Sequence, residues 1–344
     1  MDELPVPPFD LRQRVGAVVV EDPGAMAQLR TAPWWDEDPL TAWLNQGRML
    51  ADFLVETDPD PMAEARVLDF GCGAGRVLRH LVGRAAELHG AELDEPSVDW
   101  LRDHLGDHVQ AVLTTEEPGL PYPDDHFDVA YAYSVFTHLT VHWAGWLAEL
   151  HRVLRPGGVL LASTISPRTA AEFHIPVLPD DTPGVYMVGF GNPWDAGGPV
   201  TIHHREWVAE HWGRAFDILE HRDRALPPPW PHDWVVARAR PGVVSPDQLL
   251  APGSDAQTEG RARRVQVGLV RADAAGRRGW QVSQGSAVAH EANLARAALA
   301  PEVAARAAAL AEEAEQLRGE RRALRRARRL QVTRPLRSLS GRRW

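Results

Sequence analysis

Apolar residues follow a helical period in the segment before the first strong strand signal. Between residues 39 and 55 they fall at positions 40, 43, 44, 50, 53 and 54, which places them on one side of a helix. Residues 66–165 then contain five short apolar runs that alternate with helical patterns. This alternation predicts an α/β fold built on parallel strands.

The alternation stops at residue 166. Residues 166–203 are rich in Pro, Gly, Asp and aromatic residues, and a loop of this length is usually either functional or disordered. A helix is predicted over residues 204–216, because Trp207, Val208 and Trp212 share one face. Two strands are predicted after it, at residues 217–221 and 234–239.

Changes in composition divide the chain into four parts. Residues 1–38 are rich in Pro, Asp and Trp and lack a clear period, so we expect an N-terminal arm. Residues 39–240 hold the α/β pattern and form the central domain. Residues 241–262 have the composition of a linker, and residues 263–344 form a C-terminal extension.

The C-terminal extension contains a second helical signal over about residues 301–330. Pro301 suits the first turn of a helix, and alanines dominate after it. Apolar residues recur every seven positions, at Val303, Leu310, Leu317 and Leu324. This spacing fits a coiled coil that joins two copies of the chain, and it equally fits a single helix packed on its own body.

The most informative motif lies directly after the first predicted strand. An apolar run that contains Asp69 is followed by three glycines at alternate positions. These glycines are Gly71, Gly73 and Gly75. Glycines at a strand-to-helix turn let the backbone bend sharply and approach a ligand, and the next helix points unpaired N–H groups at that ligand.

The glycine spacing excludes two common nucleotide motifs. In a dinucleotide site of the form G-x-G-x-x-G the third glycine would stand at position 76, which is Arg76. A phosphate-binding P-loop requires a lysine, and the chain contains none. What remains is an acid followed by G-x-G-x-G.

An acidic residue stands near the end of the next predicted strand, within residues 85–93. Glu92 follows Gly75 by 17 residues, close to the spacing of the acid that binds ribose hydroxyls in βαβ nucleotide sites. A carboxylate can accept hydrogen bonds from two adjacent hydroxyls at once. Asp94 is the alternative, but its context, with Pro96 two residues later, is typical of a helix cap.

Two further passages extend the pattern. Residues 120–139 read L-P-Y-P-D-D-H-F-D-V-A and continue through a strand expected at 127–133, and residues 146–163 contain L-R-P-G-G between a helix and a buried strand. Together with the acid and glycines at 69–75, these passages resemble the class I S-adenosylmethionine (SAM)-dependent methyltransferases. The resemblance covers about residues 40–240.

The resemblance implies a Rossmann-like, doubly wound, seven-stranded sheet that is mostly parallel, with an antiparallel late strand, and here followed by a C-terminal helical extension. It implies SAM as the cofactor. It places the cofactor contacts at Asp69, Gly71, Cys72, Gly73, Gly75, Glu92, Leu93, Glu116 and Ser134. Glu116 would replace an Asp that the family often has before the L-P-F passage, and Cys72 would be a small packing residue or a reactive thiol.

On the acceptor side, an oxygen or nitrogen that must lose a proton needs a base within hydrogen-bond reach. His138 follows the fourth predicted strand and is our candidate catalytic residue. His203 and His204 are the rivals, and a structural role for His138 is the alternative. We expect no metal, because no carboxylate cluster of the kind used in metal-dependent methyl transfer could be placed.

The insertion at 166–203 offers residues that would suit a sugar ring. Its aromatic and acidic residues are Phe173, Tyr186, Phe190, Trp194, Asp180, Asp181 and Asp195. Aromatic faces would stack on the ring and carboxylates would accept from its hydroxyls. The alternative is that these side chains close a small satellite core.

Composition narrows the classes of function. The chain has no run of 18 apolar residues and no apolar leader after its first residues, so we expect a cytoplasmic protein. Its single cysteine excludes an intrachain disulfide. Residues 318–344 hold eleven arginines and one acid, whereas the whole chain has a net charge of −10. An acidic body with a basic tail is not the pattern of a nucleic-acid-binding catalytic face.

Two hypotheses of function follow. The first is a SAM-dependent methyltransferase that acts on a small-molecule or carbohydrate acceptor, in cell-envelope polysaccharide or natural-product biosynthesis. The second is a non-catalytic, methyltransferase-like module that acts through its basic C-terminal helix. That helix would touch the inner face of a membrane peripherally or join two copies as a homodimer, and an active enzyme could do both.

Overall fold

The structure is a computed structural model of the 344-residue chain. It describes residues 4–8, 38–58, 60–172, 183–188, 198–223, 232–255, 258–262, 264–266 and 269. All of these belong to one compact unit, Met1–Ala274. The predicted helix at 301–330, the basic tail and most of the N-terminal arm lie outside the described residues.

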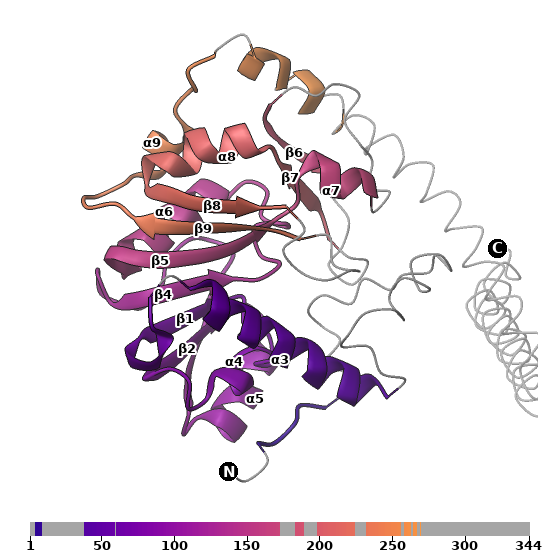
Figure 1. Cartoon of the computed structure of the whole chain (residues 1–344), viewed down its shortest axis with the longest axis vertical. Coiled ribbons are helices and arrows are strands. Elements are labelled where there is room, and N and C mark those ends of the chain that lie inside the picture. The colour runs from indigo at the N-terminus through magenta and orange to yellow at the C-terminus, as the bar shows by residue number, and fades with distance from the viewer. Residues whose placement is uncertain are drawn as a thin grey trace, which may run out of the picture. The chain divides into compact units, whose positions relative to one another are not determined.

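A seven-stranded sheet forms the centre of the unit, in the order β3-β2-β1-β4-β5-β9-β8 (Figure 1). The strands are β1 (Arg66–Phe70), β2 (Glu87–Glu92), β3 (Val109–Leu113), β4 (Phe127–Ala132), β5 (Leu154–Thr164), β8 (Phe216–Arg222) and β9 (Asp233–Ala239). Strands β1 to β5 pair in parallel, and β9 is antiparallel to both of its neighbours. The mostly parallel, seven-stranded sheet with an antiparallel late strand is therefore confirmed.

Helices cover both faces of this sheet and make a three-layer structure (Figure 1). They are α3 (Pro39–Thr57), α4 (Leu78–Leu81), α5 (Glu95–Leu105), α6 (Trp143–Val153), α7 (Pro167–Glu172), α8 (Arg205–His211) and α9 (Pro246–Leu250), with 3-10 turns η1 (Met62–Glu64) and η3 (Trp212–Arg214). One core joins α3, α4 and α5 to the sheet, and a second joins α6, α8 and α9 to the opposite face.

Each core is built from the periodic apolar residues of its helices. On one face, Leu50 and Leu54 of α3 are buried in the same cluster as Tyr131 of β4. On the other, Trp146 of α6 packs against Phe70 of β1, with ring centroids 4.7 Å apart. Each fully buried side chain of this size contributes roughly 1.5–3 kcal/mol, so the amphipathic pattern of the sequence is what fixes the layers.

Two acidic caps set the starts of the long helices. The Asp38 carboxylate accepts from the backbone N–H of Thr41 at 2.9 Å, at the start of α3. The Asp94 carboxylate accepts from the N–H of Ser97 at 3.1 Å, at the start of α5. The interpretation of Asp94 as a cap is therefore confirmed, which leaves Glu92 as the candidate for the ribose.

The helix that follows the glycines begins at Leu78, because the turn occupies the residues before it. Two later segments differ from their predicted boundaries. The helix predicted over residues 204–216 narrows to a 3-10 turn at Trp212. Within the predicted linker, Ser245 and Gln248 form a capping box for α9, and Leu249 is fully buried against α6. That part of the predicted linker belongs to the folded body.

The insertion forms a small second sheet beside the main one. Strand β6 (Val185–Val188) pairs antiparallel with β7 (Val200–His203). Tyr186 is fully buried in a cluster with Ile202 and Ala170 of α7, which favours the satellite-core alternative for this aromatic residue. The other aromatic and acidic residues named for the insertion lie outside the described residues.

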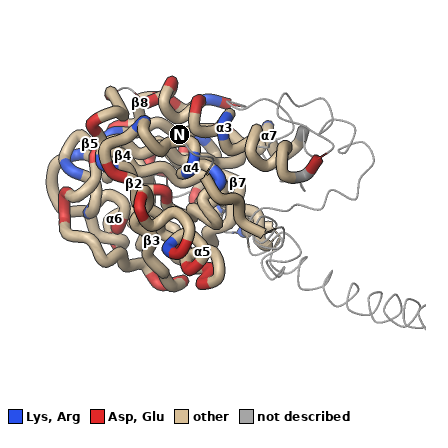
Figure 2. Tube along the Cα trace, turned by 90° about the horizontal axis from the view of Figure 1, so that it is seen from below, with Lys and Arg blue, Asp and Glu red and all other residues tan. Residues whose placement is uncertain are grey.

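Charges of both signs are interspersed over the surface of the described body (Figure 2). Many form local ion pairs, such as Arg66 with Glu87 at 3.0 Å and Arg152 with Glu149 at 2.6 Å. Among the helices that the structure describes, none combines the length and the apolar character needed to cross a bilayer.

The contact between α3 and the glycine turn gives a test of the fold. A Cβ atom on Gly47 would overlap the backbone carbonyl oxygen of Arg76. Gly47→Ala should therefore lower the free energy of unfolding by about 1–3 kcal/mol, although alanine normally stabilises a helix by about 1 kcal/mol relative to glycine. Urea denaturation measures this change.

Gly213→Ala is the matched control, since nothing lies within 4 Å of a Cβ at Gly213 in η3. The control should be neutral or stabilising. Equal effects of the two substitutions would contradict a tight contact between α3 and the turn.

Candidate functional site

The three glycines form a turn that only glycine adopts without strain. Gly71, Gly73 and Gly75 have φ angles of 82°, 51° and 78°, in the left-handed region that disfavours a Cβ atom. The Gly71 N–H donates to the carbonyl of Ala91 at 2.8 Å, which joins the turn to the end of β2. A Cβ on Gly71 would also overlap the side chain of Val135. Glycine is thus required at these positions by the backbone conformation and, at Gly71, by the lack of room for a Cβ atom.

Glu92 is the residue that connects the turn to the end of β2. Its side chain is buried, and one carboxylate oxygen, Oε2, accepts from the Gly73 N–H at 2.8 Å. The other oxygen accepts from the N–H groups of Leu93 at 2.7 Å and Asp94 at 3.0 Å. A carboxylate offers about four acceptor positions, so Oε2 keeps one for a ligand hydroxyl. The acid and the glycine turn that the sequence paired are in direct contact.

Asp69 lies beneath the turn, inside the sheet. Its carboxyl group accepts from the Tyr131 hydroxyl at 2.7 Å, and the residue is 2% exposed. Burial raises the pKa of Asp69 to about 8, with a further rise from the charge of Glu92, while the Tyr131 hydrogen bond and Arg76 oppose it. Because this hydrogen bond ties the carboxyl group to β4, Asp69 supports the turn from below.

The remaining predicted cofactor residues fall into two groups. Cys72 is buried within the turn, and burial raises its pKa well above the usual value, which favours a packing role over a reactive thiol. Leu93 is 57% exposed at the end of β2, and Leu113, at the end of β3, is 43% exposed. Glu116 is exposed in the next loop, whose position is held by a 3.1 Å hydrogen bond from Trp146 to the Glu116 carbonyl. The exposed side chains of Leu93 and Leu113 form an apolar edge beside Glu92.

Sequence reasoning missed two residues on the other side of the turn. Arg76, noted only because it breaks the dinucleotide pattern, donates a hydrogen bond to the side-chain oxygen of Gln46 in α3. Gln46 itself was not singled out. The one available signal was Gly47, a glycine inside a helical pattern, which marks the close approach of α3 to the turn.

Ser134 and His138 lie together at the carboxyl end of β4. Ser134 has a φ of 59°, and its N–H donates to the Ser163 hydroxyl at 2.7 Å. The Ser134 hydroxyl is 3.4 Å from Nε2 of His138, while Nδ1 of His138 is 2.8 Å from the carbonyl oxygen of Pro199. A carbonyl only accepts, so Nδ1 carries the proton and Nε2 is the basic nitrogen.

The environment keeps His138 neutral. Burial lowers its pKa below the ordinary value of 6.5, and the hydrogen bond to Pro199 offsets part of that effect. A neutral imidazole with a fixed tautomer can accept a proton at Nε2. His138 is therefore equipped for the role of base that the sequence suggested.

The two rival histidines are placed differently. His203 is 1% exposed, lies beside the ring of Trp207 and has its pKa lowered to about 3 by burial. His204 is 4% exposed and packs edge-on against Tyr186 in the satellite core. Both side chains contribute to packing behind the sheet edge, which favours His138 among the three.

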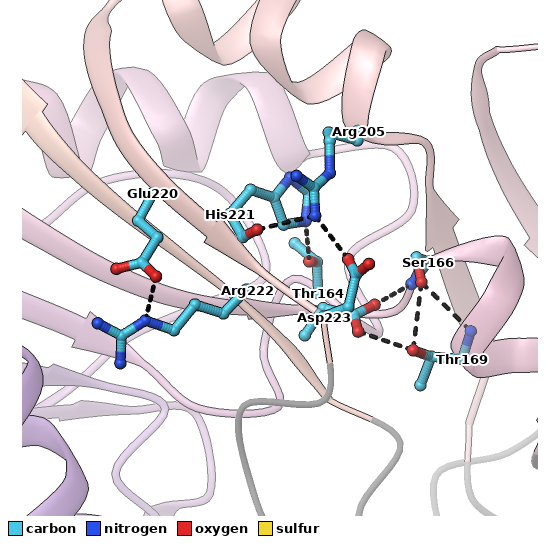
Figure 3. Close-up of polar contacts among 9 residues, drawn as sticks. Thr164, Ser166, Thr169, Arg205, Glu220, His221, Arg222 and Asp223 are labelled. Atoms are coloured by element: carbon cyan, nitrogen blue, oxygen red, sulfur yellow. Dashed lines mark hydrogen bonds and ion pairs between the residues drawn. The ribbon is translucent and has the colours of Figure 1, made fainter.

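A polar network closes the sheet edge next to these residues (Figure 3). Asp233, buried at the start of β9, accepts from the Ser166 N–H and from the Thr169 hydroxyl, the latter at 2.7 Å. Figure 3 also shows Arg205 donating to the His221 carbonyl at 2.8 Å. The network ties α7, α8 and the ends of β8 and β9 into one wall. In the part of the chain that the structure describes, no group of three His, Cys, Asp or Glu residues could hold a metal ion.

Comparisons with known proteins point to one family. A family model described as a methyltransferase domain matches residues 68–162. Malonyl-[acyl-carrier protein] O-methyltransferase of Salmonella typhimurium is 35% identical over 114 residues, or 32% of this chain and 43% of that protein. Ubiquinone biosynthesis O-methyltransferase of Thiobacillus denitrificans is 28% identical over 149 residues, or 42% of this chain and 62% of that protein. The chain spans about half the length of these relatives.

Solved structures of similar architecture include two methyltransferases. A SAM-dependent methyltransferase from Mesorhizobium loti is 19% identical, with a TM-score of 0.42, and the match covers 57% of this chain and 99% of that one. The 1,6-didemethyltoxoflavin-N1-methyltransferase of Burkholderia thailandensis, solved with S-adenosylhomocysteine, is also 19% identical with a TM-score of 0.42. That match covers 58% of this chain and 79% of that one.

The pKa of Asp69 predicts a pH-dependent stability. Between pH 4 and pH 8 the folded state keeps a proton on Asp69 that the unfolded chain releases. The contribution of Asp69 to the free energy of unfolding therefore decreases as pH rises, and it levels off above pH 8. The difference in the free energy of unfolding between wild type and Asp69→Asn should fall by about 2–4 kcal/mol from pH 5 to pH 8. Urea denaturation at several pH values measures it.

Asp128→Asn is the control, because ion pairing with Arg155 and the bond from the Arg66 N–H hold the pKa of Asp128 below its ordinary value of 3.8. The contribution of Asp128 to the free energy of unfolding is therefore constant over the same pH range and is lost only at acidic pH. If the difference in unfolding free energy between wild type and Asp69→Asn does not change with pH, Asp69 ionises normally in the folded state.

The family match and the geometry coincide on the same segment. The matched residues, 68–162, begin in β1 and end in β5. Between them lie the glycine turn and the carboxylate that binds it. Over residues 68–162 the chain therefore matches a methyltransferase domain, in agreement with the resemblance of its motifs to the SAM-dependent methyltransferases.

Proposed function

We propose that the chain is a SAM-dependent methyltransferase that acts on a small-molecule acceptor. The observation that carries this proposal is the 2.8 Å hydrogen bond from the Gly73 N–H to the buried carboxylate of Glu92. This bond brings Glu92, the acid that we propose for the ribose, directly beside a bare glycine backbone. A packed core at this position would have left no need for three successive left-handed glycines.

The residues at the turn fit the cofactor. Glu92 keeps an acceptor position for a ribose hydroxyl, and Leu93 offers an exposed apolar surface at the same edge, suited to the face of a base. Gly71 and Gly73 supply backbone without side chains. Glu116 would meet the exocyclic amine of adenine from the loop after β3. Asp69 supports the turn from within the sheet.

Bound SAM supplies an activated methyl group on a sulfonium, so the chain needs mainly to orient the acceptor and exclude water. His138 would hold the proton that the acceptor loses, at Nε2, because Nδ1 is committed to the Pro199 carbonyl. Ser134, whose hydroxyl is 3.4 Å from that nitrogen, would position the acceptor group or relay its proton.

The names of the relatives support an oxygen acceptor. Two of them are O-methyltransferases, one acting on malonyl-[acyl-carrier protein] and one in ubiquinone biosynthesis. An alcohol, phenol or acid must lose a proton during transfer, which matches a neutral histidine at the sheet edge. A carbohydrate hydroxyl from envelope polysaccharide or natural-product biosynthesis belongs to the same chemical class.

A tethering role remains a second proposal for the C-terminal extension. The eleven arginines of residues 318–344 could hold a cytoplasmic enzyme at an anionic membrane surface, and the heptad pattern after Pro301 could join two copies. Both features lie outside the described residues. Neither competes with catalysis, because the glycine turn is intact.

Cofactor binding tests the proposed function. Isothermal titration should show that wild type binds S-adenosylhomocysteine and that Glu92→Gln weakens this binding about 10- to 100-fold. The loss corresponds to one or two hydrogen bonds to a charged acceptor. Glu87→Gln is the matched control on the same strand, since Glu87 is exposed and paired with Arg66. Absence of binding by wild type would contradict the proposal.

The tautomer of His138 can be measured without knowing the acceptor. Long-range ¹H–¹⁵N NMR should show a proton on Nδ1 and a ring that stays neutral as pH falls through 6.5, because burial lowers the pKa of His138. His138→Gln identifies the resonance by its loss. A ring protonated at Nε2, or one charged at pH 6.5, would remove His138 as the base.

A further inference from the structure

The small sheet of β6 and β7 lies between His138 and helical residues near the end of the compact unit. Residues 258–262 and 264–266 are helical, although the boundaries predicted from the sequence placed them in a linker and a C-terminal extension. Asp255 caps their first turn, because its carboxylate accepts from the Thr258 N–H at 3.0 Å. We call these residues the late helical segment. Hydrogen bonds and strand pairing join this segment to His138.

Strand β7 holds the loop that carries His138. The Thr201 N–H donates to the Thr137 carbonyl at 2.7 Å, and the Thr201 hydroxyl donates to the Leu139 carbonyl at 2.9 Å. One residue of β7 thus binds both neighbours of His138 in the chain. Just before β7, the Pro199 carbonyl accepts the Nδ1 proton of His138 at 2.8 Å. These three hydrogen bonds fix the backbone around His138 and the orientation of its ring.

The outer edge of β6 is held by a glutamine of the late helical segment. The Met187 N–H donates to the side-chain oxygen of Gln266 at 2.8 Å, and the Gln266 amide nitrogen donates to the Met187 carbonyl at 3.2 Å. A side-chain amide offers a donor and an acceptor side by side, as a backbone edge does. Gln266 therefore pairs with Met187 as the next strand of a sheet would. Met187 lies directly opposite Thr201 in the register of β6 and β7.

A two-stranded sheet needs support at its edges. Isolated pairs of strands are at best marginally stable in water, and an unpaired edge exposes N–H and C=O groups. On the β7 edge the support comes from residues 137–139 and from Ile165, whose carbonyl accepts from the His203 N–H at 2.7 Å. On the β6 edge Gln266 supplies it. Loss of Gln266 would therefore free one edge of the sheet that holds His138.

Packing keeps the late helical segment close to β6. Ala262 and Val265 lie against the core cluster that contains Tyr186. A Cβ atom on Gly184, just before β6, would stand 2.9 Å from the Cβ of Ala262, which is too close for two carbon atoms. The backbone before β6 and the segment are thus in direct contact, and this contact keeps the side chain of Gln266 within reach of the strand.

The proton on Nδ1 decides whether His138 can act as a base. A neutral imidazole carries a proton on one nitrogen and a lone pair on the other. The Pro199 carbonyl holds the proton on Nδ1, which leaves the lone pair on Nε2, 3.4 Å from the Ser134 hydroxyl. A ring that lost its bond to Pro199 could carry the proton on Nε2 instead, and the site would then lose its basic nitrogen. The proposed reaction therefore requires the Pro199 carbonyl at this position.

We propose that Gln266 is a positioning residue for His138. Gln266 holds Met187, strand pairing carries the constraint from Met187 to Thr201, and β7 with Pro199 holds both the loop and the ring of His138. The late helical segment therefore belongs to the body of the active site. The role of His138 as the base rests on the proposed function, whereas the tautomer that Gln266 maintains is measured independently of it.

NMR of the full chain tests this arrangement. In Gln266→Ala, hydrogen exchange of the Met187 amide should be about 5- to 10-fold faster than in wild type, because one hydrogen bond at the strand edge is lost. Long-range ¹H–¹⁵N spectra should show both tautomers of His138 in place of the Nδ1 form alone. Arg261→Ala is the matched control, since Arg261 is exposed in the same segment. It should leave both signals as in wild type.

Two substitutions at Thr201 test the contact nearer to His138. Thr201→Val keeps the shape of the side chain but removes the hydroxyl that donates to the Leu139 carbonyl. It should also give a mixture of His138 tautomers. Thr201→Ser keeps the hydroxyl and should show the single Nδ1 form, as in wild type. Circular dichroism confirms that each variant is folded.

The outcomes separate a positioning role from a structural one. A single Nδ1 tautomer of His138 in Gln266→Ala would overturn the proposal, even if exchange at Met187 became faster. Equal tautomer mixtures in Thr201→Val and Thr201→Ser would overturn the role of the Thr201 hydroxyl.

Cofactor binding keeps this proposal distinct from the proposed function. All variants should bind S-adenosylhomocysteine within about twofold of wild type, because Glu92 and the glycine turn are unchanged. Absence of binding by wild type would overturn the proposed function, whereas the NMR result alone decides whether Gln266 positions His138.

Discussion

The hydrogen bond from Gly73 to Glu92 is the contact on which the site depends. Without the Glu92 carboxylate, three backbone N–H groups at the ends of β1 and β2 would lose their acceptor, and buried N–H groups are almost always paired. The same residue's carbonyl accepts from Thr114 at 2.7 Å, which continues the order to the end of β3. One acid therefore connects the carboxyl ends of three neighbouring strands.

Two carboxyl groups share this region, and their surroundings give them different roles. Glu92 accepts three N–H groups at the edge of the sheet, whereas Asp69, with a pKa of about 8, accepts one hydroxyl deep in the sheet. A proton on Asp69 at neutral pH avoids placing a second anion beside Glu92. The two acids thus differ in their partners, backbone N–H groups of the turn for Glu92 and a hydroxyl within the sheet for Asp69, and a sequence pattern that treats both as motif residues does not show this difference.

Sequence patterns predicted the parts of the structure that depend on local chemistry. Alternating periods predicted the seven strands, and the spacing from Gly75 pointed to Glu92, which contacts the turn because one βαβ unit fixes that geometry. Contacts between elements that are distant in the sequence could not be predicted from these patterns. The period of α3 shows an apolar face but not its register on the turn, so Gln46 and Arg76 did not stand out. The bond from His138 to Pro199 likewise joins β4 to the insertion across 61 residues.

The family match ends at residue 162, inside β5, and this boundary has a structural meaning. The matched segment contains the glycine turn, Glu92 and His138, which are the candidate cofactor residues and the candidate base. The wall beyond them is built by α7, α8, β8 and β9, all later in the sequence. The buried Asp233 fixes that wall through Ser166 and Thr169. Because this wall beside His138 comes from the unmatched part of the chain, we expect the residues that distinguish one acceptor from another to lie there.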